Sequence, residues 1–122
     1  MLQVLLLTLI VFLSLDFVFL YSMRSMFNKQ VVAVQGSPVV FDIYAAILCY
    51  IALIFGIYYF IIREKKSILE AFLLGIIIYA VYETTTLAIL KNWTYKTAII
   101  DTIWGGTLFA LTTFIVYAIK KN

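Results

Sequence analysis

The sequence is poor in the residues on which most enzymes depend: it has no histidine, one cysteine and one proline, and only 12% of its 122 residues are charged. Without histidine the commonest metal ligand and general base is missing, so a zinc site or a catalytic triad is not expected. The lone Cys49 excludes an intramolecular disulfide. The chain also has no phosphate-binding loop, dinucleotide fingerprint or nucleophile elbow. The sequence therefore predicts no catalytic residue, no metal and no other cofactor, and favours a protein that is not an enzyme.

Hydrophobic residues, in contrast, make up 66% of the chain, and its mean hydropathy is +1.11. A soluble domain has roughly 45–50% apolar and about 25% charged residues. A short soluble chain could not hide this much apolar surface, because small domains bury the smallest fraction of theirs. The lipid bilayer is therefore the expected solvent. The net charge of +3 comes from basic residues near the ends of the apolar runs, which suits anionic head groups and does not predict nucleic-acid binding.

Four apolar runs reach the length of a membrane span, which is about 17–25 residues. They cover roughly residues 2–21, 41–62, 67–90 and 98–119, with an error of about 2–4 residues at each end. The first run lacks the basic start of a signal peptide and contains Asp16, so we expect it to be retained. Short connections make successive spans antiparallel neighbours. The sequence thus predicts an all-α fold, an integral membrane four-helix bundle formed by one domain over residues 1–122, with both termini on the same side.

The longest connection, about 22–40, mixes apolar and polar residues and is expected to lie in the membrane interface. Sidedness follows from the basic residues that flank the spans. The side of the termini holds Arg63, Lys65, Lys66, Lys120 and Lys121, and the other side holds Arg24, Lys29, Lys91 and Lys96. This difference of one residue predicts cytoplasmic termini, or termini on the equivalent side of a viral internal membrane.

Each span carries one carboxylate near the end of the bundle away from the termini: Asp16, Asp42, Glu83 and Asp101. At about 1.5 Å per residue, Asp16 and Glu83 lie roughly 8–10 Å inside their spans and Asp101 roughly 5 Å. Asp42 begins its span, where an acid favours the helix dipole, so we expect a solvated helix start there. An acid within a bilayer needs a partner, a cavity or a function. We predict that the other three form one polar site; the alternative is three separate acids that reach for the interface.

Polar and aromatic residues beside the acids are candidates for the same site. Three consecutive threonines follow Glu83 and cover most of the helix circumference, so at least one faces the interior, which makes Thr84 and Thr86 candidates. Trp104 lies on the same helix face as Asp101. Its indole N–H could serve a buried carboxylate, or the ring could belong to the interfacial aromatic belt.

Three cations near the same end are possible charge partners of the acids, namely Lys91, Lys96 and Arg24. Their long stems can run along apolar surface and place the charge elsewhere. Paired in this way, the acids would form a structural ion-pair cluster that needs no ligand.

Small residues repeat every four positions on the last two spans. The third span has Ala80, Thr84 and Ala88, and the fourth has Ala98, Thr102, Gly106 and Ala110. Because packing rather than the hydrophobic effect joins helices in a membrane, such stripes predict a tight seam between these two spans. Glu83 and Asp101 each precede a stripe residue, about 100° around the helix, so we expect both acids beside that seam.

Two blocks resemble a known family: the stretch from Tyr82 to Trp93, Tyr-Glu-Thr-Thr-Thr-Leu-Ala-Ile-Leu-Lys-Asn-Trp, and then Asp101-Thr-Ile-Trp104-Gly105. They are similar to the Tyr-Asp-x-Thr-Asn-x-Ala-Thr-Leu-x-x-Trp and Asp-x-x-Trp-Gly patterns of the predicted membrane family called domain of unknown function 2177. That family also has an aspartate late in its first helix, which Asp16 matches. This chain departs at Glu83, where the family has aspartate, and at Thr86, where it has asparagine. The resemblance implies a four-helix integral membrane protein, with relatives in bacteria and large DNA viruses and no established activity.

Two functions remain open from the sequence. The first is a structural or interaction component of a membrane, or of a membrane-containing assembly such as a virion, with a membrane-protein partner or a second copy of the chain. The second is a transporter, an ion- or lipid-binding protein or a lipid-modifying enzyme that uses the carboxylate cluster, because acids within a membrane are functional candidates by default.

Overall fold

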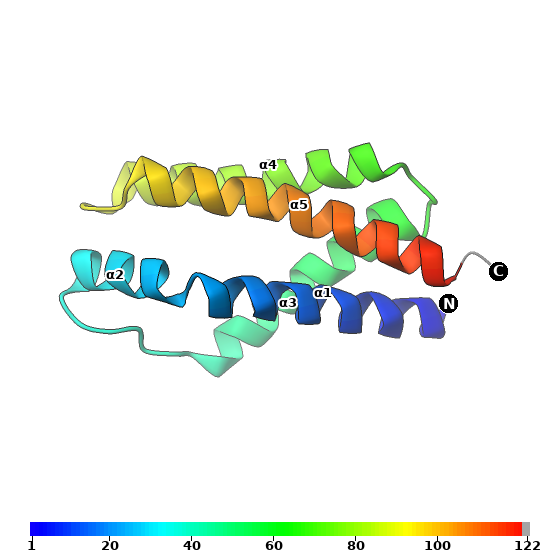
Figure 1. The fold of residues 1–122 in the computed structure, drawn as a ribbon, viewed down its shortest axis with the longest axis horizontal. Helices are drawn as coiled ribbons and strands as arrows, with labels where there is room; N and C mark the ends of the chain where they lie inside the picture. The colour runs from blue at the N-terminus through cyan, green and yellow to red at the C-terminus, as the bar shows by residue number, and fades with distance from the viewer. Residues whose placement is uncertain (121–122) are drawn as a thin grey trace.

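The structure is a computed structural model that describes residues 1–120, and it is helical throughout its ordered elements. Helix α1 covers Leu2–Ser22, α2 Arg24–Gln35, α3 Ile43–Ile57, the π-helical turn η1 Tyr58–Ile62, α4 Ile68–Ile89 and α5 Tyr95–Ile119. Four of these stretches are long and apolar enough to cross a membrane, with α3 and η1 forming one of them. The start of α1 and the end of α5 lie at the same end of the bundle (Figure 1). The predicted all-α membrane bundle with four spans is therefore confirmed.

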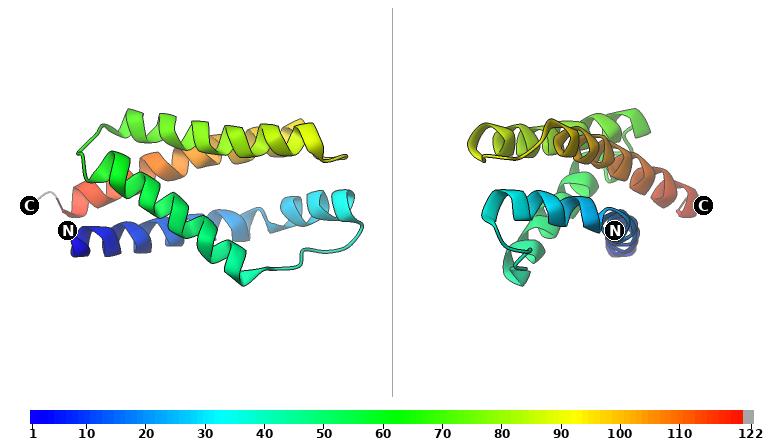
Figure 2. Two further views of the ribbon diagram at one scale, coloured as in Figure 1. Left: turned by 180° about the vertical axis from the view of Figure 1, so that it is seen from behind. Right: turned by 60° about the vertical axis from the view of Figure 1, so that its left-hand side comes forward.

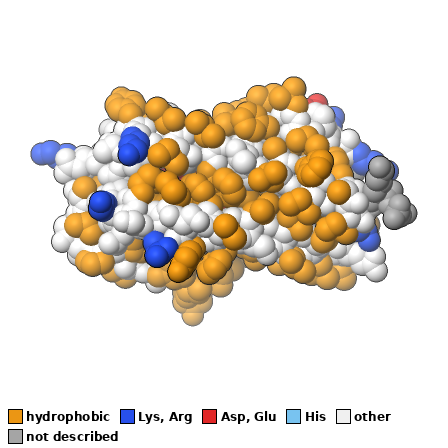
Figure 3. All heavy atoms as spheres, in the orientation of Figure 1, with side chains coloured by type: hydrophobic (Ala, Val, Ile, Leu, Met, Phe, Trp, Pro, Cys, Tyr) orange, Lys and Arg blue, Asp and Glu red, His pale blue; other side chains and the backbone are white. Residues whose placement is uncertain are grey.

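The outer surface matches a bilayer environment. Hydrophobic side chains cover the middle of the face shown in Figure 3, whereas lysine and arginine side chains lie toward its two ends. A surface with this much apolar area would aggregate in water, so lipid is the solvent that fits it. Lys121, which contributed to the predicted sidedness, lies outside the described residues.

Each span after the first begins with a side-chain cap. Asp42 accepts hydrogen bonds from the backbone N–H groups of Tyr44 and Ala45 at 3.1 and 3.2 Å, as expected of an acid at a helix start. Ser67 and Glu70 form a reciprocal capping box at the start of α4. These caps satisfy backbone donors that the first helical turn would otherwise leave unpaired, so they fix where the spans begin.

Helices α4 and α5 pack backbone to backbone along glycines. A Cβ placed on Gly75 would clash with the carbonyl oxygen of Gly105 and lie only 3.0 Å from the Cα of Gly106. The tight seam between the last two spans is therefore present, but on α4 it follows the face of Ala71, Gly75 and Glu83, which are all buried.

The predicted small-residue stripe on α4 lies to one side of this seam. Ala80 is half-buried, whereas Thr84 and Ala88 are exposed, so Ala88 does not take part in the packing as the four-residue repeat suggested. On α5 the stripe agrees better: Gly106 is buried and Ala110 is half-buried. Glycine allows a closer approach than alanine, so Gly75 rather than the alanine stripe sets the rotation of α4.

Helix α1 packs on α5 through aromatic contacts, while α3 meets the bundle over only part of its length. Phe12 is fully buried and makes edge-to-face contacts with Phe109 and Tyr50, with ring centroids 5.7 and 6.3 Å apart. In Figures 1 and 2, α3 starts at the outer edge of the molecule and crosses diagonally toward the start of α4. Its first turns are exposed, and Ile54 and Ile57 are its buried residues. This divergence leaves space between α1 and α3.

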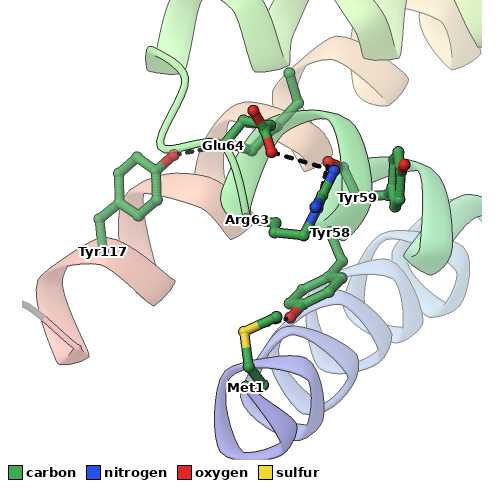
Figure 4. Close-up of polar contacts among 7 residues, drawn as sticks. Met1, Tyr58, Tyr59, Arg63, Glu64 and Tyr117 are labelled. Carbon is green, nitrogen blue, oxygen red and sulfur yellow. Dashed lines mark hydrogen bonds and ion pairs between the residues drawn. The ribbon is translucent and has the colours of Figure 1, made fainter.

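The end that carries the termini is closed by η1 (Figure 4). The hydroxyl of Tyr117 on α5 donates to the carbonyl of Lys66 at 2.7 Å and to that of Ile61 at 3.3 Å. Arg63 pairs with Glu64 at 3.1 Å and lies over the ring of Tyr59. Tyr117 thus supplies a donor to carbonyls at the π-helical turn and the loop after it, where the regular helical ladder is interrupted.

At the opposite end, α2 continues beyond α1 after a break at Met23 and lies across from the α4–α5 connection (Figure 1). The buried Gln30 donates to the carbonyl of Asn92 at 2.7 Å and accepts from the N–H and hydroxyl of Thr94 at 3.0 and 2.9 Å. Asn92 in turn donates to the carbonyl of Ala33 at 3.0 Å. The segment expected to lie in the interface thus contains a helix, α2, that is hydrogen-bonded to the α4–α5 connection.

Candidate functional site: an acidic cavity between four helices

Asp16 lies inside the bundle and has both carboxylate oxygens occupied. It is 6% exposed and continues the buried face of α1, one turn after Phe12. Tyr50 on α3 donates its hydroxyl to Oδ2, and the indole Nε1 of Trp104 on α5 donates to Oδ1 at 2.9 Å. The Trp104 ring is itself stacked on Phe19, with centroids 4.5 Å apart. Two donors from other helices therefore satisfy both oxygens of this acid and hold α1, α3 and α5 together.

Glu83 is buried still more completely, at 1% exposed, and only one of its oxygens has a hydrogen-bond partner. The indole Nε1 of Trp93, in the α4–α5 connection, donates to Oε1 at 2.8 Å. Oε2 has no partner among the described residues. The carboxyl group of Asp101, on α5, faces the same space as that of Glu83.

All three acids line one open cavity of about 370 Å³, which we call the acidic cavity. Asp16, Glu83 and Asp101 form its polar part, and Tyr50, Tyr79 and Trp93 are among its aromatic walls. No lysine or arginine is among the residues that line it, all of which belong to the described part of the chain. Within residues 1–120, no set of three or more acidic or cysteine side chains is close enough together to hold a metal ion. The cavity therefore presents negative charge and aromatic faces without a built-in cation.

The predicted charge partners lie elsewhere. Between residues 1 and 120 the one ion pair is that of Arg63 with Glu64, at the opposite end of the bundle. Lys91 and Lys96 are exposed. Arg24 donates to the carbonyl of Tyr21 at 2.6 Å and lies over the Tyr21 ring. The ion-pair cluster considered from the sequence is therefore absent from the described residues, because hydration and local backbone contacts hold these cations at the surface.

The threonines divide between the two faces of α4. Thr84 is exposed and donates back to the carbonyl of Ala80 at 2.6 Å. Thr86 is 7% exposed, so it is the threonine that faces the interior, and it donates to the carbonyl of Tyr82 at 2.8 Å. Neither hydroxyl reaches an acid in the described structure, since each satisfies the carbonyl one turn back in its own helix.

Sequence reasoning missed the donors that serve the acids. Trp104 does donate to a buried carboxylate, but to Asp16 on another helix rather than to Asp101 on its own. Tyr50 and Trp93 were not candidates, although Trp93 closes the sequence block that begins at Tyr82. A search for aromatic N–H and O–H donors near the level of the acids would have found both.

Comparison with known proteins gives a family and nothing more specific. A family model described as "Predicted membrane protein (DUF2177)" matches residues 1–118. No curated protein matches the chain, and no solved structure matches it.

Proposed function

The chain belongs to this family of predicted membrane proteins, and from that premise we propose that it binds a small monovalent cation at the acids of its internal cavity. The observation that carries the proposal is Glu83, which is buried beside Asp101 with Oε2 unpaired. A cation-binding role favours the second of the two functions that the sequence left open.

Charge balance is the physical reason. Two carboxyl groups that line one cavity repel each other when both are charged, and Glu83 is only 1% exposed. Burying a charge without a counter-charge costs several kcal/mol. Asp16 has Tyr50 and Trp104 as donors, whereas in residues 1–120 Trp93 is the one donor found for Glu83 and none is found for Asp101. A bound cation supplies the missing counter-charge and the missing hydrogen bonds or coordination.

The two tryptophans of the chain make the proposal directly testable. Trp93 donates to Glu83 and Trp104 to Asp16, and the chain contains no other tryptophan. Intrinsic tryptophan fluorescence therefore reports only on indoles that contact the acids. We expect full-length protein in dodecyl maltoside to change its fluorescence in a saturable way when titrated with sodium, potassium or ethanolammonium chloride at constant ionic strength.

The matched variants are Glu83→Gln and Glu64→Gln. The first removes the buried charge and keeps an oxygen that can accept from Trp93, so saturable binding is expected to be lost. The second removes an exposed charge at the other end of the bundle, so binding is expected to be unchanged. A flat titration of the parent protein with all three cations, or equal binding by the two variants, would contradict the proposal.

A role as an interaction component is the second candidate, and Asp16 favours it. Its bonds to Tyr50 and Trp104 link three helices without any ligand. In this case the acids only fix the packing of a bundle that docks with a membrane-protein partner or a second copy in a membrane or a lipid-containing virion. Light scattering of the detergent complex tests self-association: a stable dimer with no cation response would favour this function.

We further propose that both termini face the cytoplasm or its equivalent, because the sequence places five basic residues at that end, Arg63, Lys65, Lys66, Lys120 and Lys121, and four at the other. A reporter fused to the C-terminus tests this, because alkaline phosphatase is active only outside the cytoplasm and green fluorescent protein fluoresces only inside it. Phosphatase activity would overturn the assignment.

A further inference from the structure

Three hollows meet at Phe41 and Tyr50, and together they have the chemistry of one amphipathic molecule. The first is the acidic cavity. The second, which we call the Arg24 hollow, has a volume of about 860 Å³ and is bordered by Arg24, Phe17 and Tyr21 on the side of α1. The third, the α1–α3 groove, has a volume of about 560 Å³ and lies where α3 diverges from α1. Phe41 and Tyr50 line all three, so the hollows are neighbours.

From the start of α2 and then back along α1, the three hollows change from polar to apolar. Arg24 lies at the outer end, Asp16 is eight residues or about 12 Å deeper along the axis, and Leu13, Leu9 and Leu5 follow along the groove. The groove is lined by aliphatic and aromatic side chains, with the Tyr50 hydroxyl turned to Asp16. A chain of methylene groups fits such a lining, whereas a charged or hydrated ligand does not.

Arg24 supplies a cation in the hollow that adjoins the groove. One guanidinium nitrogen donates to the carbonyl of Tyr21, and within residues 1–120 no acid pairs with this side chain. A further hollow joins Arg24 to Ser22, Ser25 and Asn28, which add hydroxyl and amide donors. A guanidinium with hydroxyl and amide neighbours is complementary to a phosphodiester, since its planar fork binds phosphate oxygens with charge-assisted hydrogen bonds.

The acidic cavity selects the kind of cation. Glu83 Oε2 is a buried acceptor without a donor, so the best occupant both carries positive charge and donates hydrogen bonds. A primary ammonium has three N–H donors, whereas a quaternary ammonium has none. The aromatic rings of Tyr79 and Trp93 line the cavity, and an aromatic ring attracts both kinds of ammonium. The carboxyl groups therefore distinguish the primary from the quaternary ammonium.

We propose that the three hollows form a binding site for a phospholipid with a primary-amine head group, of the phosphatidylethanolamine class. The ammonium lies in the acidic cavity against Glu83 and Asp101, the phosphodiester lies at Arg24, and an acyl chain follows the α1–α3 groove. This inference rests on the proposed cation binding and identifies the cation as part of a lipid.

The test separates the contribution of the primary amine from that of the rest of the lipid. Full-length protein in dodecyl maltoside is titrated with dihexanoyl phosphatidylethanolamine, with the matched phosphatidylcholine and phosphatidylglycerol, and with ethanolamine alone, using tryptophan fluorescence. We expect the phosphatidylethanolamine to bind on the order of tenfold more tightly than the other two lipids and than free ethanolamine, because only it satisfies all three hollows.

Two pairs of variants separate the parts of the site. Arg24→Gln is expected to weaken phosphatidylethanolamine on the order of tenfold and to leave ethanolamine binding unchanged, whereas Arg63→Gln at the far end changes neither. Ile47→Phe fills the groove and is expected to weaken the lipid only. Leu48→Phe, one residue on and outside the groove, is the control. Both positions of the second pair are exposed on α3, so the bundle tolerates the substitutions.

The failures are distinguishable. Equal affinity for the three lipids, or an unchanged lipid affinity in both Arg24→Gln and Ile47→Phe, overturns the lipid assignment while ethanolamine binding upholds the cation site. Absence of binding by ethanolamine and by every lipid overturns the lipid assignment, and it overturns both proposals when sodium and potassium also fail to bind.

Discussion

Replacing Gly75 by alanine tests the seam on which the acidic cavity depends. The added Cβ would lie 2.9 Å from the carbonyl carbon of Gly105 and 3.0 Å from the Cα of Gly106, where unstrained carbon atoms are about 3.5–4.0 Å apart. These atoms are backbone on both sides, so no side chain can rotate away, and α4 and α5 must move apart by about 0.5–1 Å. A gap of that size forfeits roughly a quarter to a half of the contact energy of the atoms that line it.

The expected cost follows from these contacts. Overpacking a close contact costs about 1–3 kcal/mol, and alanine recovers at most about 1 kcal/mol of helix propensity, so we expect net destabilisation of roughly 1–2 kcal/mol. Gly56→Ala is the matched control: nothing lies within 4 Å of a Cβ placed there, so this variant is expected to be neutral or slightly stabilised. Reversible unfolding in mixed dodecyl maltoside and sodium dodecyl sulfate micelles measures both.

The same substitution has a consequence at the site. Glu83 and Asp101 belong to the two helices that Gly75→Ala forces apart, so the variant is expected to bind ethanolamine more weakly than Gly56→Ala does. Equal stability and equal ethanolamine affinity of the two alanine variants would refute the argument that glycine contacts position the acids.

Three further substitutions probe single interactions. Tyr50→Phe removes a donor to a buried carboxylate and is expected to cost about 1–3 kcal/mol in detergent unfolding, whereas Tyr44→Phe, at an exposed position, is silent. Gln30→Ala removes three hydrogen bonds that latch α2, so limited proteolysis within residues 24–42 should accelerate, with Lys29→Ala unchanged; equal cleavage would show that the latch contributes nothing. Asp42→Ala removes a helix cap worth about 1 kcal/mol, which faster amide exchange in the first turn of α3 would reveal; unchanged exchange would argue against the cap.

The spans could be located from the sequence because the bilayer fixes the length of an apolar run, and polar residues mark where each run ends. The predicted start of the second span at residue 41 and the structural start at Ile43 differ by two residues, because Asp42 caps the helix from the position before its first turn. The last helix begins at Tyr95, earlier than expected, because Thr94 caps it and its first turn is polar. Hydropathy finds where a helix enters the apolar layer, whereas capping residues decide where it begins.

The rotation of the helices was harder to derive than their ends. The four-residue repeat of Ala80, Thr84 and Ala88 is a property of one helix, whereas the seam depends on what the partner presents. Gly105 and Gly106 face α4, and Gly75 is the α4 residue that can approach them. A lone glycine outside the repeat therefore outweighed a regular stripe of alanines, since backbone contact depends on the smallest residue available.

The depth of the three acids in the membrane could be derived from the sequence, whereas their hydrogen-bond donors could not. All three lie at similar depth because each is a fixed number of residues from a span end. Which indole or phenol reaches which carboxylate depends on helix rotation and tilt, which the sequence does not specify. Arginine and lysine were natural candidates for the acids, yet bringing them inward would cost their hydration, whereas Trp93 and Trp104 donate a hydrogen bond and are already apolar.

The donors of Asp16 also constrain how the chain is made. They stand 34 and 88 positions later in the sequence, on α3 and α5. During synthesis the first span therefore enters the membrane with an unsatisfied acid and keeps it until the last span has emerged. A chain that stops after α4 leaves Asp16 without its indole partner. Completion of the bundle is thus the event that satisfies both oxygens of Asp16.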